Sequence, residues 1–339
     1  MSEFLCMDSN FSTTRLITRQ KPAIEESTAL LFLPDTKGRK GEGGLRKNGY
    51  YKKTYPNKPL ISIVTVVYNG DKFLEKAIQS VINQTYENVE FIIIDGGSTD
   101  NSVDIIKKYE AKVDYWVSED DSGQSDAFNK GFSLCQGELV SWVNGDDILL
   151  PGAIKEVVNL YNRKPSLNWI VGNVLWMTED EKLILCRKGE SWNSYLVKCG
   201  VLNVYGPTSF FTLDLFNKVG KLQSWMHYRM DTDLWWRFVT EGEKFERLEG
   251  YTWALRVHKD AKTTGKYFKD SELSSENHPS QIQMKKEDNY IAITYQNNCF
   301  LRKILLYMIR ISTFRYVMSI VDSFRFRNCS YTKVLSNNT

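Results

Sequence analysis

The sequence lacks several features that would assign it to a class at once. Its six cysteines form no C-x-x-C pair and no zinc-ligand spacing. No apolar run approaches the roughly 18 residues of a membrane-spanning helix. Residues 1–10 lack the basic start and apolar run of a signal peptide. A net charge of +3 is too small to indicate nucleic-acid binding. We therefore expect reduced thiols, a cytoplasmic location and no nucleic-acid partner.

What the sequence does contain is an alternation of strand and helix patterns. Hydrophobic residues make up 42% of the 339 residues, so a sizeable core is expected. From residue 60 onward the predicted strands are 61–68, 91–95, 114–117, 139–143, 169–177 and 208–212. The predicted helices lie over 73–82, 103–109, 127–135, 151–161, 214–219 and 233–240. Such alternation predicts βαβ units, and hence an α/β fold with a mostly parallel sheet flanked by helices.

The two ends of the chain are less regular. Residues 1–59, called the N-terminal arm below, are interpreted as a basic arm or linker, with 30–33 as a short strand or helix. Residues 60–265 form the expected main domain, with a nucleotide-binding half at 60–150 and an acceptor half at 151–265. Residues 266–339 form an expected helical tail.

Two apolar strands end in acidic turns beside glycine. The first reads F-I-I-I-D-G-G-S-T-D at 91–100 and the second L-V-S-W-V-N-G-D-D at 139–147. Ligands bind at the carboxyl ends of strands in open parallel sheets, and carboxylates suit Mg²⁺ or Mn²⁺. The turn after the first strand, Y-N-G-D at 68–71, contains neither G-x-G-x-x-G nor a P-loop, which disfavours NAD enzymes and phosphate-loop NTPases.

Several blocks together resemble glycosyltransferase family 2, which has the GT-A fold of nucleotide-diphospho-sugar transferases. They are S-I-V-T-V-V-Y-N-G at 62–70, S-V-I-N-Q-T-Y at 80–86, the turn at 91–100 and V-N-G-D-D-I-L-L at 143–150. The stretches 118–123 and 126–131 resemble the subgroup that makes bacterial surface polysaccharides. The match weakens towards His258 and leaves the arm and the tail unexplained.

The resemblance implies a role for each matching residue. Tyr68 and Asp95 would hold the nucleobase. Asp146 would be the last acid of the D-x-D metal motif, whose first position is Asn144 here, and would hold Mg²⁺ or Mn²⁺ on the diphosphate. His258 would reach the diphosphate or the metal. The remaining expected substrate-binding residues are Asp126, Asn144, Trp236 and Arg237.

The block D-T-D-L-W-W-R at 231–237 would supply the catalytic base. Asp231 is the first choice and Asp233 the second, and Met230 stands where the family usually has another acid. Two acids two residues apart on one helix point to different faces, so only one can face the sugar. Transfer with inversion needs one base and no acid, because a metal-bound diphosphate leaves as an anion. Glycosidases instead use two carboxyl groups.

The resemblance thus implies an inverting glycosyltransferase. Its donor would be a nucleotide-diphospho-sugar, most simply UDP-linked, and its acceptor a hydroxyl of a glycan or a polyprenyl-linked saccharide. Two alternatives stay open. A sugar nucleotidyltransferase would need a basic glycine-rich signature after the first strand, which Y-N-G at 68–70 is not. A non-catalytic nucleotide-sugar or glycan-binding scaffold is favoured by Asn144 in place of an acid.

Aromatic and tail residues allow two interpretations each. The tryptophans of the second half are sugar-stacking platforms or core residues; they are Trp192, Trp225, Trp235, Trp236 and Trp253. An apolar stripe of helical spacing in the tail comprises Leu301, Ile304, Leu305, Met308 and Ile311. It either lies on an anionic surface at the inner face of the cell membrane or packs on the catalytic domain.

Overall fold

The computed structural model describes residues 4–22, 30–263, 278–295, 314–327 and 329–332. The chain divides into two compact units, and each is a combination of separate stretches. Unit 1 comprises Met1–Asn168 and Phe210–Ser224, and unit 2 comprises Trp169–Ser209 and Trp225–Thr339. The predicted domain boundaries at residues 59, 150 and 265 divide the chain into consecutive segments, whereas each unit here combines separate stretches. These boundaries stay predictions.

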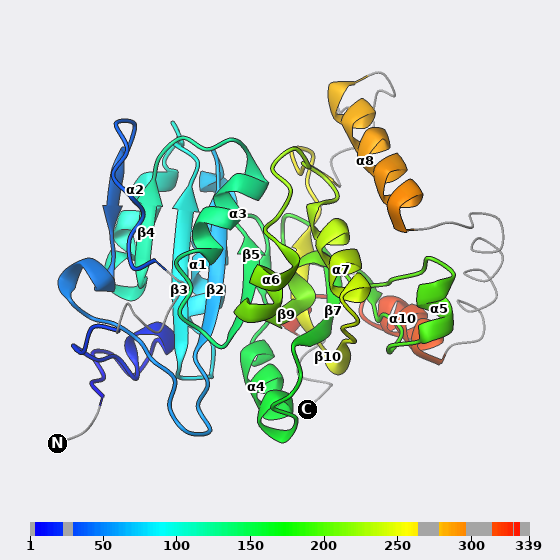
Figure 1. Cartoon of the computed structure of the whole chain (residues 1–339), viewed down its shortest axis with the longest axis horizontal. Coiled ribbons are helices and arrows are strands. Elements are labelled where there is room, and N and C mark those ends of the chain that lie inside the picture. The colour runs from blue at the N-terminus through cyan, green and yellow to red at the C-terminus, as the bar shows by residue number, and fades with distance from the viewer. Residues whose placement is uncertain (1–3, 23–29, 264–277, 296–313, 328, 333–339) are drawn as a thin grey trace. The chain divides into compact units, whose positions relative to one another are not determined.

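Unit 1 contains a sheet that is parallel at its centre. Its strands are β1 (Gly41–Gly43), β2 (Ile61–Val67), β3 (Val89–Asp95), β4 (Tyr115–Ser118), β5 (Leu139–Asn144), β6 (Ile148–Leu149) and β9 (Ser209–Thr212). The order is β1-β4-β3-β2-β5-β9, with β4, β3, β2 and β5 mutually parallel (Figure 1). β1 and β9 are antiparallel to β4 and β5 at the two sides. The predicted α/β class with a mostly parallel sheet is confirmed.

The central strands are buried and largely apolar on both faces; the buried acids Glu90 and Asp95 of β3 are hydrogen-bonded. Every residue of β2 and β3 is buried, as continuous β-branched runs between helices require. The helices of unit 1 are α1 (Asp71–Ile82), α2 (Ser102–Lys108), α3 (Gln124–Phe132), α4 (Ala153–Arg163) and α6 (Leu213–Val219). Helix α3 packs on β2 and β3, and a Cβ on Gly131 would lie 2.3 Å from the Val64 side chain. Glycine at 131 therefore permits the close approach.

The N-terminal arm is a packed part of unit 1. Its strand β1 pairs with β4, from Gly41 opposite Ser118 to Gly43 opposite Trp116. The Ser12 hydroxyl donates to two carbonyls at the end of α1, each at 3.0 Å. The arm thus covers one side of the sheet and one end of a helix.

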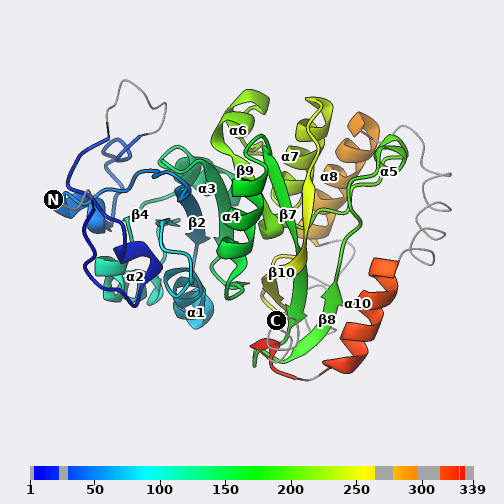
Figure 2. The same ribbon diagram turned by 90° about the horizontal axis from the view of Figure 1, so that it is seen from below.

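Unit 2 contains three strands and its own helices. Its strands are β7 (Trp169–Met177), β8 (Leu183–Arg187) and β10 (Glu246–Arg256), with β7 parallel to β10 and antiparallel to β8. Its helices are α5 (Ser194–Lys198), α7 (Met230–Thr240), α8 (Pro279–Tyr295) and α10 (Phe314–Arg325). Helix α10 lies along β8 (Figure 2). Within the described ranges, no helix combines the length and apolarity that crossing a membrane requires.

Several local predictions differ from the structure. Residues 30–33 form neither strand nor helix. Helix α4 begins at Ala153, after Gly152 at φ +79°, so Pro151 precedes the helix. Thr212, not Asp214, caps α6 by accepting the Leu215 N–H at 3.3 Å. Helix α7 begins at residue 230 rather than 233. The predicted stripe at 301–311 lies outside the described residues.

Candidate functional site

The acidic turns of unit 1 lie at one edge of the sheet. Strand β2 ends just before Tyr68, β3 ends at Asp95, β4 at Ser118 and β5 at Asn144. These four strands are parallel neighbours, so their carboxyl ends form one continuous edge. This is where open α/β sheets bind ligands. The structure therefore brings the predicted residues of the nucleotide-binding half together along this edge.

Asp95 organises the turn that follows β3. Its buried carboxylate accepts the N–H groups of Gly97 and Ser98, at 3.1 and 3.0 Å, and the Ser118 hydroxyl at 2.6 Å. The Ser98 hydroxyl donates to its other oxygen. The turn needs a positive φ of +80° at Gly97, which glycine adopts without a steric penalty. A nucleobase contact by Asp95 stays a prediction.

Tyr68 stands exposed beside this turn. It is 66% exposed, which is unusual for a large aromatic side chain at the end of a buried strand. A Cβ built on Gly96 would lie 3.5 Å from the Tyr68 ring and 2.5 Å from a carboxylate oxygen of Asp121. Only the glycine backbone fits between ring and carboxylate. A ring with a free face next to polar groups suits stacking on a base.

A carboxyl group that the sequence analysis did not single out joins this edge. Burial raises the pKa of Asp121, and the charges of Asp126 and Asp95 raise it further, while the Gly123 N–H at 2.7 Å and Lys130 oppose the rise. Asp126 itself accepts the Ser122 N–H at 3.1 Å at the start of α3. Clustered carboxyl groups of this kind favour a cation or a hydrogen-bond donor as ligand.

The second acidic turn places its two acids differently. Asp147 is buried and accepts a hydrogen bond from the Asn144 amide at 2.8 Å. The Asn144 side-chain oxygen in turn accepts from Gln124 at 3.4 Å. Asp146 is only half-buried at the same edge. Of the two carboxylates, Asp146 is thus the one that a ligand at the edge can reach.

Oxygen donors at this edge fit Mg²⁺ or Mn²⁺ when a diphosphate supplies the other ligands. Within the described part of the chain, no three His, Cys, Asp or Glu side chains lie close enough to hold a metal ion on their own. Mg²⁺ commonly binds through one or two carboxylates together with substrate phosphates and water. Asp146 provides one such carboxylate, so the residues present are compatible with a metal–diphosphate complex.

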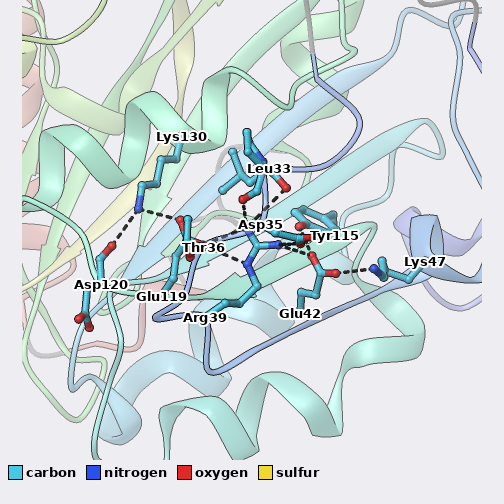
Figure 3. A network of polar contacts seen from close by, with 11 residues as sticks. Leu33, Asp35, Thr36, Arg39, Glu42, Lys47, Tyr115, Glu119, Asp120 and Lys130 are labelled. Carbon is cyan, nitrogen blue, oxygen red and sulfur yellow. Dashed lines mark hydrogen bonds and ion pairs between the residues drawn. The ribbon is translucent and has the colours of Figure 1, made fainter.

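The arm holds the loop after β4 through a polar network (Figure 3). Glu119 accepts hydrogen bonds from Thr36 at 2.9 Å, from Arg39 at 3.0 Å and from Lys130 at 2.9 Å. Burial raises the pKa of Glu119, but these three partners together hold it below its ordinary value. Arg39 also pairs with Glu42 at 2.9 Å. The network fixes the start of the loop that carries Asp121.

Lys40 extends the same arm to the turn at Asp95. Its ammonium donates to the carbonyls of Gly97 and Ser98, at 2.5 and 3.4 Å. A cation from residues 1–59 therefore lies at the turn that closes β3. Sequence reasoning interpreted this segment as a basic arm or linker and did not place Lys40 at the turn, because neither composition nor periodicity points to a contact 57 residues away.

In unit 2, the two acids of α7 have different surroundings. Asp231 is half-buried, and burial raises its pKa, while the Thr232 N–H at 2.6 Å and the charge of Arg229 lower it. Asp233 is 1% exposed and is occupied by Arg237 at 2.8 Å and by the Tyr295 hydroxyl at 2.9 Å. A half-buried carboxyl with a raised pKa suits a general base, whereas a buried carboxyl held by an arginine and a tyrosine is structural.

The segment before Asp231 is fixed by a carboxylate of α8 that sequence reasoning missed. Glu287 is fully buried and accepts the backbone N–H groups of His227, Tyr228 and Arg229, each at 2.8 Å. Gln283 donates to the same carboxylate at 2.8 Å. Three amides on one carboxylate set the path of the chain into α7. In the sequence, Glu287 is one acid in a largely polar helix, and nothing there marks it as the partner of this segment.

Other predicted residues of unit 2 have packing contacts. The Trp236 ring is buried and stacks on Tyr295 with centroids 5.9 Å apart. Arg237 pairs with Asp233. The predicted substrate contacts of Trp236 and Arg237 stay predictions. His258 is buried just after β10 ends. Trp235 and Trp253 are also buried, while Trp225 is 39% exposed.

Comparison with known proteins gives consistent matches. The family model described as glycosyl transferase family 2 matches residues 62–184. An uncharacterized glycosyltransferase of Rickettsia typhi is 30% identical over 213 residues, covering 61% of this chain and 66% of the relative. The glycosyltransferase GlyG of Streptococcus pneumoniae is 33% identical over 117 residues, covering 34% of this chain and 38% of the relative. Over these residues the chain is similar to glycosyltransferase family 2.

These matches are partial. The aligned region spans less than two thirds of the length of either relative. Among solved structures, TarS of S. aureus in complex with UDP-GlcNAc has a TM-score of 0.46 and 16% identity, covering 59% of each chain. The N-terminal arm and helices α8 and α10 lie outside the residues that the family model matches.

Proposed function

We propose that this protein transfers a sugar from a nucleotide-diphospho-sugar to an acceptor hydroxyl with inversion. The donor is UDP-linked, and the acceptor is a glycan or a lipid-linked saccharide of polysaccharide synthesis. The observation that carries the proposal is Asp231: a half-buried carboxyl with a raised pKa at the start of α7, in a chain similar to family 2. Asp233, its neighbour on the helix, is occupied by structural partners.

The reaction is a single displacement. The acceptor oxygen attacks the anomeric carbon while Asp231 takes the hydroxyl proton. The bond from the anomeric carbon to the diphosphate oxygen breaks, and the nucleoside diphosphate leaves with the bonding electrons. One base suffices, because the leaving group needs no proton when its charge is neutralised. An α-linked donor thus gives a β-linked product.

The edge of unit 1 would bind the donor. Tyr68 stacks on the base, Asp95 orders the turn beneath it and Asp126 borders the same edge. Asp146 would hold Mg²⁺ or Mn²⁺, with Asn144 next to it, and the ion would stabilise the leaving diphosphate. His258 is proposed as a further contact to the diphosphate or the ion. These roles rest on position and burial at the strand ends.

The first experiment measures nucleoside diphosphate release from UDP-, GDP- and dTDP-sugars, with Mn²⁺ or Mg²⁺ and with EDTA. We expect slow release of UDP from one donor, and its loss in EDTA. Equal release in EDTA would refute the metal dependence. Failure of every donor to bind with metal would refute the donor-site assignment.

A matched pair of variants tests the base. Asp231→Asn should bind donor normally and lose roughly 10²–10⁴-fold in transfer rate. Its pH profile supports the assignment independently: the acidic limb of the wild-type rate should lie above the ordinary Asp pKa of about 3.9, because burial raises the pKa of Asp231. Asp233→Asn, the control, should weaken folding through the lost Arg237 and Tyr295 contacts. Undiminished transfer by folded Asp231→Asn would contradict the proposal.

A second candidate is a non-catalytic nucleotide-sugar-binding scaffold. It is favoured by one observation: the first position of the metal motif is Asn144, whose amide bonds to Gln124 and Asp147. It predicts donor binding without release under any condition. The variant Asn144→Asp distinguishes the enzyme from the scaffold. An enzyme that functions with asparagine at this position should keep its turnover in the variant, whereas a scaffold should show no turnover in either form.

A further inference from the structure

Helix α10 turns polar side chains towards its own unit, whereas a surface helix usually turns its apolar side inward. Its side towards β8 is polar: the Ser319 hydroxyl accepts the Lys188 N–H at 2.7 Å, and the Ser323 hydroxyl accepts the Cys186 N–H at 2.9 Å. Asp322 accepts the Tyr251 hydroxyl at 2.9 Å. The described side chains on this side of the helix thus bind unit 2 through hydrogen bonds.

The opposite side of α10 is apolar and exposed. We define the outward face as Val317, Ile320, Val321 and Phe324, which are 45%, 39%, 46% and 73% exposed. Their spacing of i, i+3, i+4 and i+7 places them on one stripe, because neighbours three and four apart share a helix face. A surface helix normally turns such a stripe inward. Contiguous exposed apolar side chains of this kind mark an interaction surface.

Within the described part of the chain, the exposed charged side chains of α10 and of the two residues after it are basic. Arg325 and Arg327 are exposed at the end of the helix. The one acid of the helix, Asp322, is buried on the polar side against Tyr251, with the Lys188 ammonium 3.7 Å away. The sequence from 296 onward has seven basic residues against that single acid; they are Arg302, Lys303, Arg310, Arg315, Arg325, Arg327 and Lys333.

We propose that the outward face of α10 docks the protein on an anionic lipid bilayer. An apolar stripe that contains Phe and is bordered by Arg is the pattern of helices that lie in the membrane interface. Basic residues beside the stripe add attraction to anionic headgroups. A second copy of this chain would instead have to accommodate like charges on both partners. The proposal deepens the proposed function, since a lipid-linked acceptor lies at such a surface.

The test is flotation of the full chain with vesicles of phosphatidylcholine alone or mixed with phosphatidylglycerol. Wild type should float with the anionic vesicles, less so in high salt, and stay unbound with the neutral ones. Phe324→Ser should lower the bound fraction about tenfold, because Phe324 is the largest and most exposed of the four side chains. Arg325→Gln with Arg327→Gln should lower it and flatten its salt dependence.

The matched control is Ile293→Ser on α8, which removes an apolar side chain that is 78% exposed on a different helix. It should leave flotation unchanged. Absence of wild-type binding to anionic vesicles, or equal loss in Ile293→Ser, would overturn the proposal. So would a dimer in light scattering that Phe324→Ser dissociates without any vesicle effect. UDP release from soluble donor, measured without vesicles, reports on the proposed function alone, so the two failures are distinguishable.

Discussion

The N-terminal arm and helix α10 both lie outside the matched family segment, yet they attach in opposite ways. The arm inserts charges inward: Arg46 is 2% exposed and donates to Glu90 at 2.6 Å and to the Leu134 carbonyl at 2.9 Å. Helix α10 turns its polar side inward and its apolar stripe outward. The arm thus completes its own unit, whereas α10 leaves apolar surface for a partner.

The difference shows how to separate structural additions from interaction surfaces. Charges that enter a core are tolerated only when every polar atom is paired, so a paired charge network indicates integration into the fold. Exposed apolar side chains do not stabilise the unit by burial, so a contiguous stripe of them indicates a contact with another surface. Four substitutions test this contrast, beginning with the largest expected effect.

The strongest test of the arm is Arg46→Met. Removing the guanidinium leaves Glu90 buried with only Ser62 and the Gln136 N–H as partners. Breaking one side of a buried ion pair should lower the free energy of unfolding by about 3–5 kcal/mol, measured by denaturant titration. Adding Glu90→Gln to the variant should recover part of the loss, because no buried charge then lacks a partner. A loss below about 1 kcal/mol would show that the arm is not integrated.

Arg39→Ala tests the network of Figure 3 and its pH dependence. Losing its bonds to Glu119 and Glu42 should cost about 1.5–3 kcal/mol. The folded pKa values of both glutamates are lowered, so their stabilisation is present above the unfolded pKa near 4.3 and lost as pH falls further. Wild type should lose stability on acidification, and Arg39→Ala should lose less. Parallel pH curves for the two proteins would contradict the network's role.

Much of unit 1 was predictable because its signals are local. Strands β2, β3 and β5 are short runs dominated by apolar residues, and α1 shows helical spacing, so each can be predicted from a dozen residues or fewer. The acidic turns follow from the same strands. The choice of Asp231 over Asp233 stays a prediction; both acids lie on α7, and the structure adds that Asp233 is held by Arg237 and Tyr295.

The rest depends on contacts that no local pattern encodes. Glu119 meets Arg39 from 80 residues away, and Glu287 meets the segment before α7 from 58 to 60 residues away. Trp236 stacks on a tyrosine of α8, so its aromatic character alone could not separate core from sugar platform. The start of α7 was missed because Asp231 and Asp233 both have cap-forming side chains, whereas the helix begins after Arg229, which makes no side-chain cap hydrogen bond.

A third prediction moves to the polar side of α10. Asp322→Ala removes the acceptor for the Tyr251 hydroxyl, which is buried, and should cost about 1–2 kcal/mol. Tyr251→Phe should cost a similar amount. The double variant should cost clearly less than the sum of the two single losses, because both single changes remove the same hydrogen bond. Additive losses in thermal unfolding would mean that the bond does not hold α10 to unit 2.

The smallest effect on stability is expected from Phe324→Ser. Its ring is 73% exposed, so the free energy of unfolding should change by no more than about 0.5 kcal/mol. Phe326, two residues on, is 3% exposed, and Phe326→Ser should cost about 3–5 kcal/mol in the same denaturant titration. The pair separates the two sides of one short segment with the same substitution. If Phe324→Ser were as destabilising as its partner, the outward face would belong to the core, and α10 would resemble the arm after all.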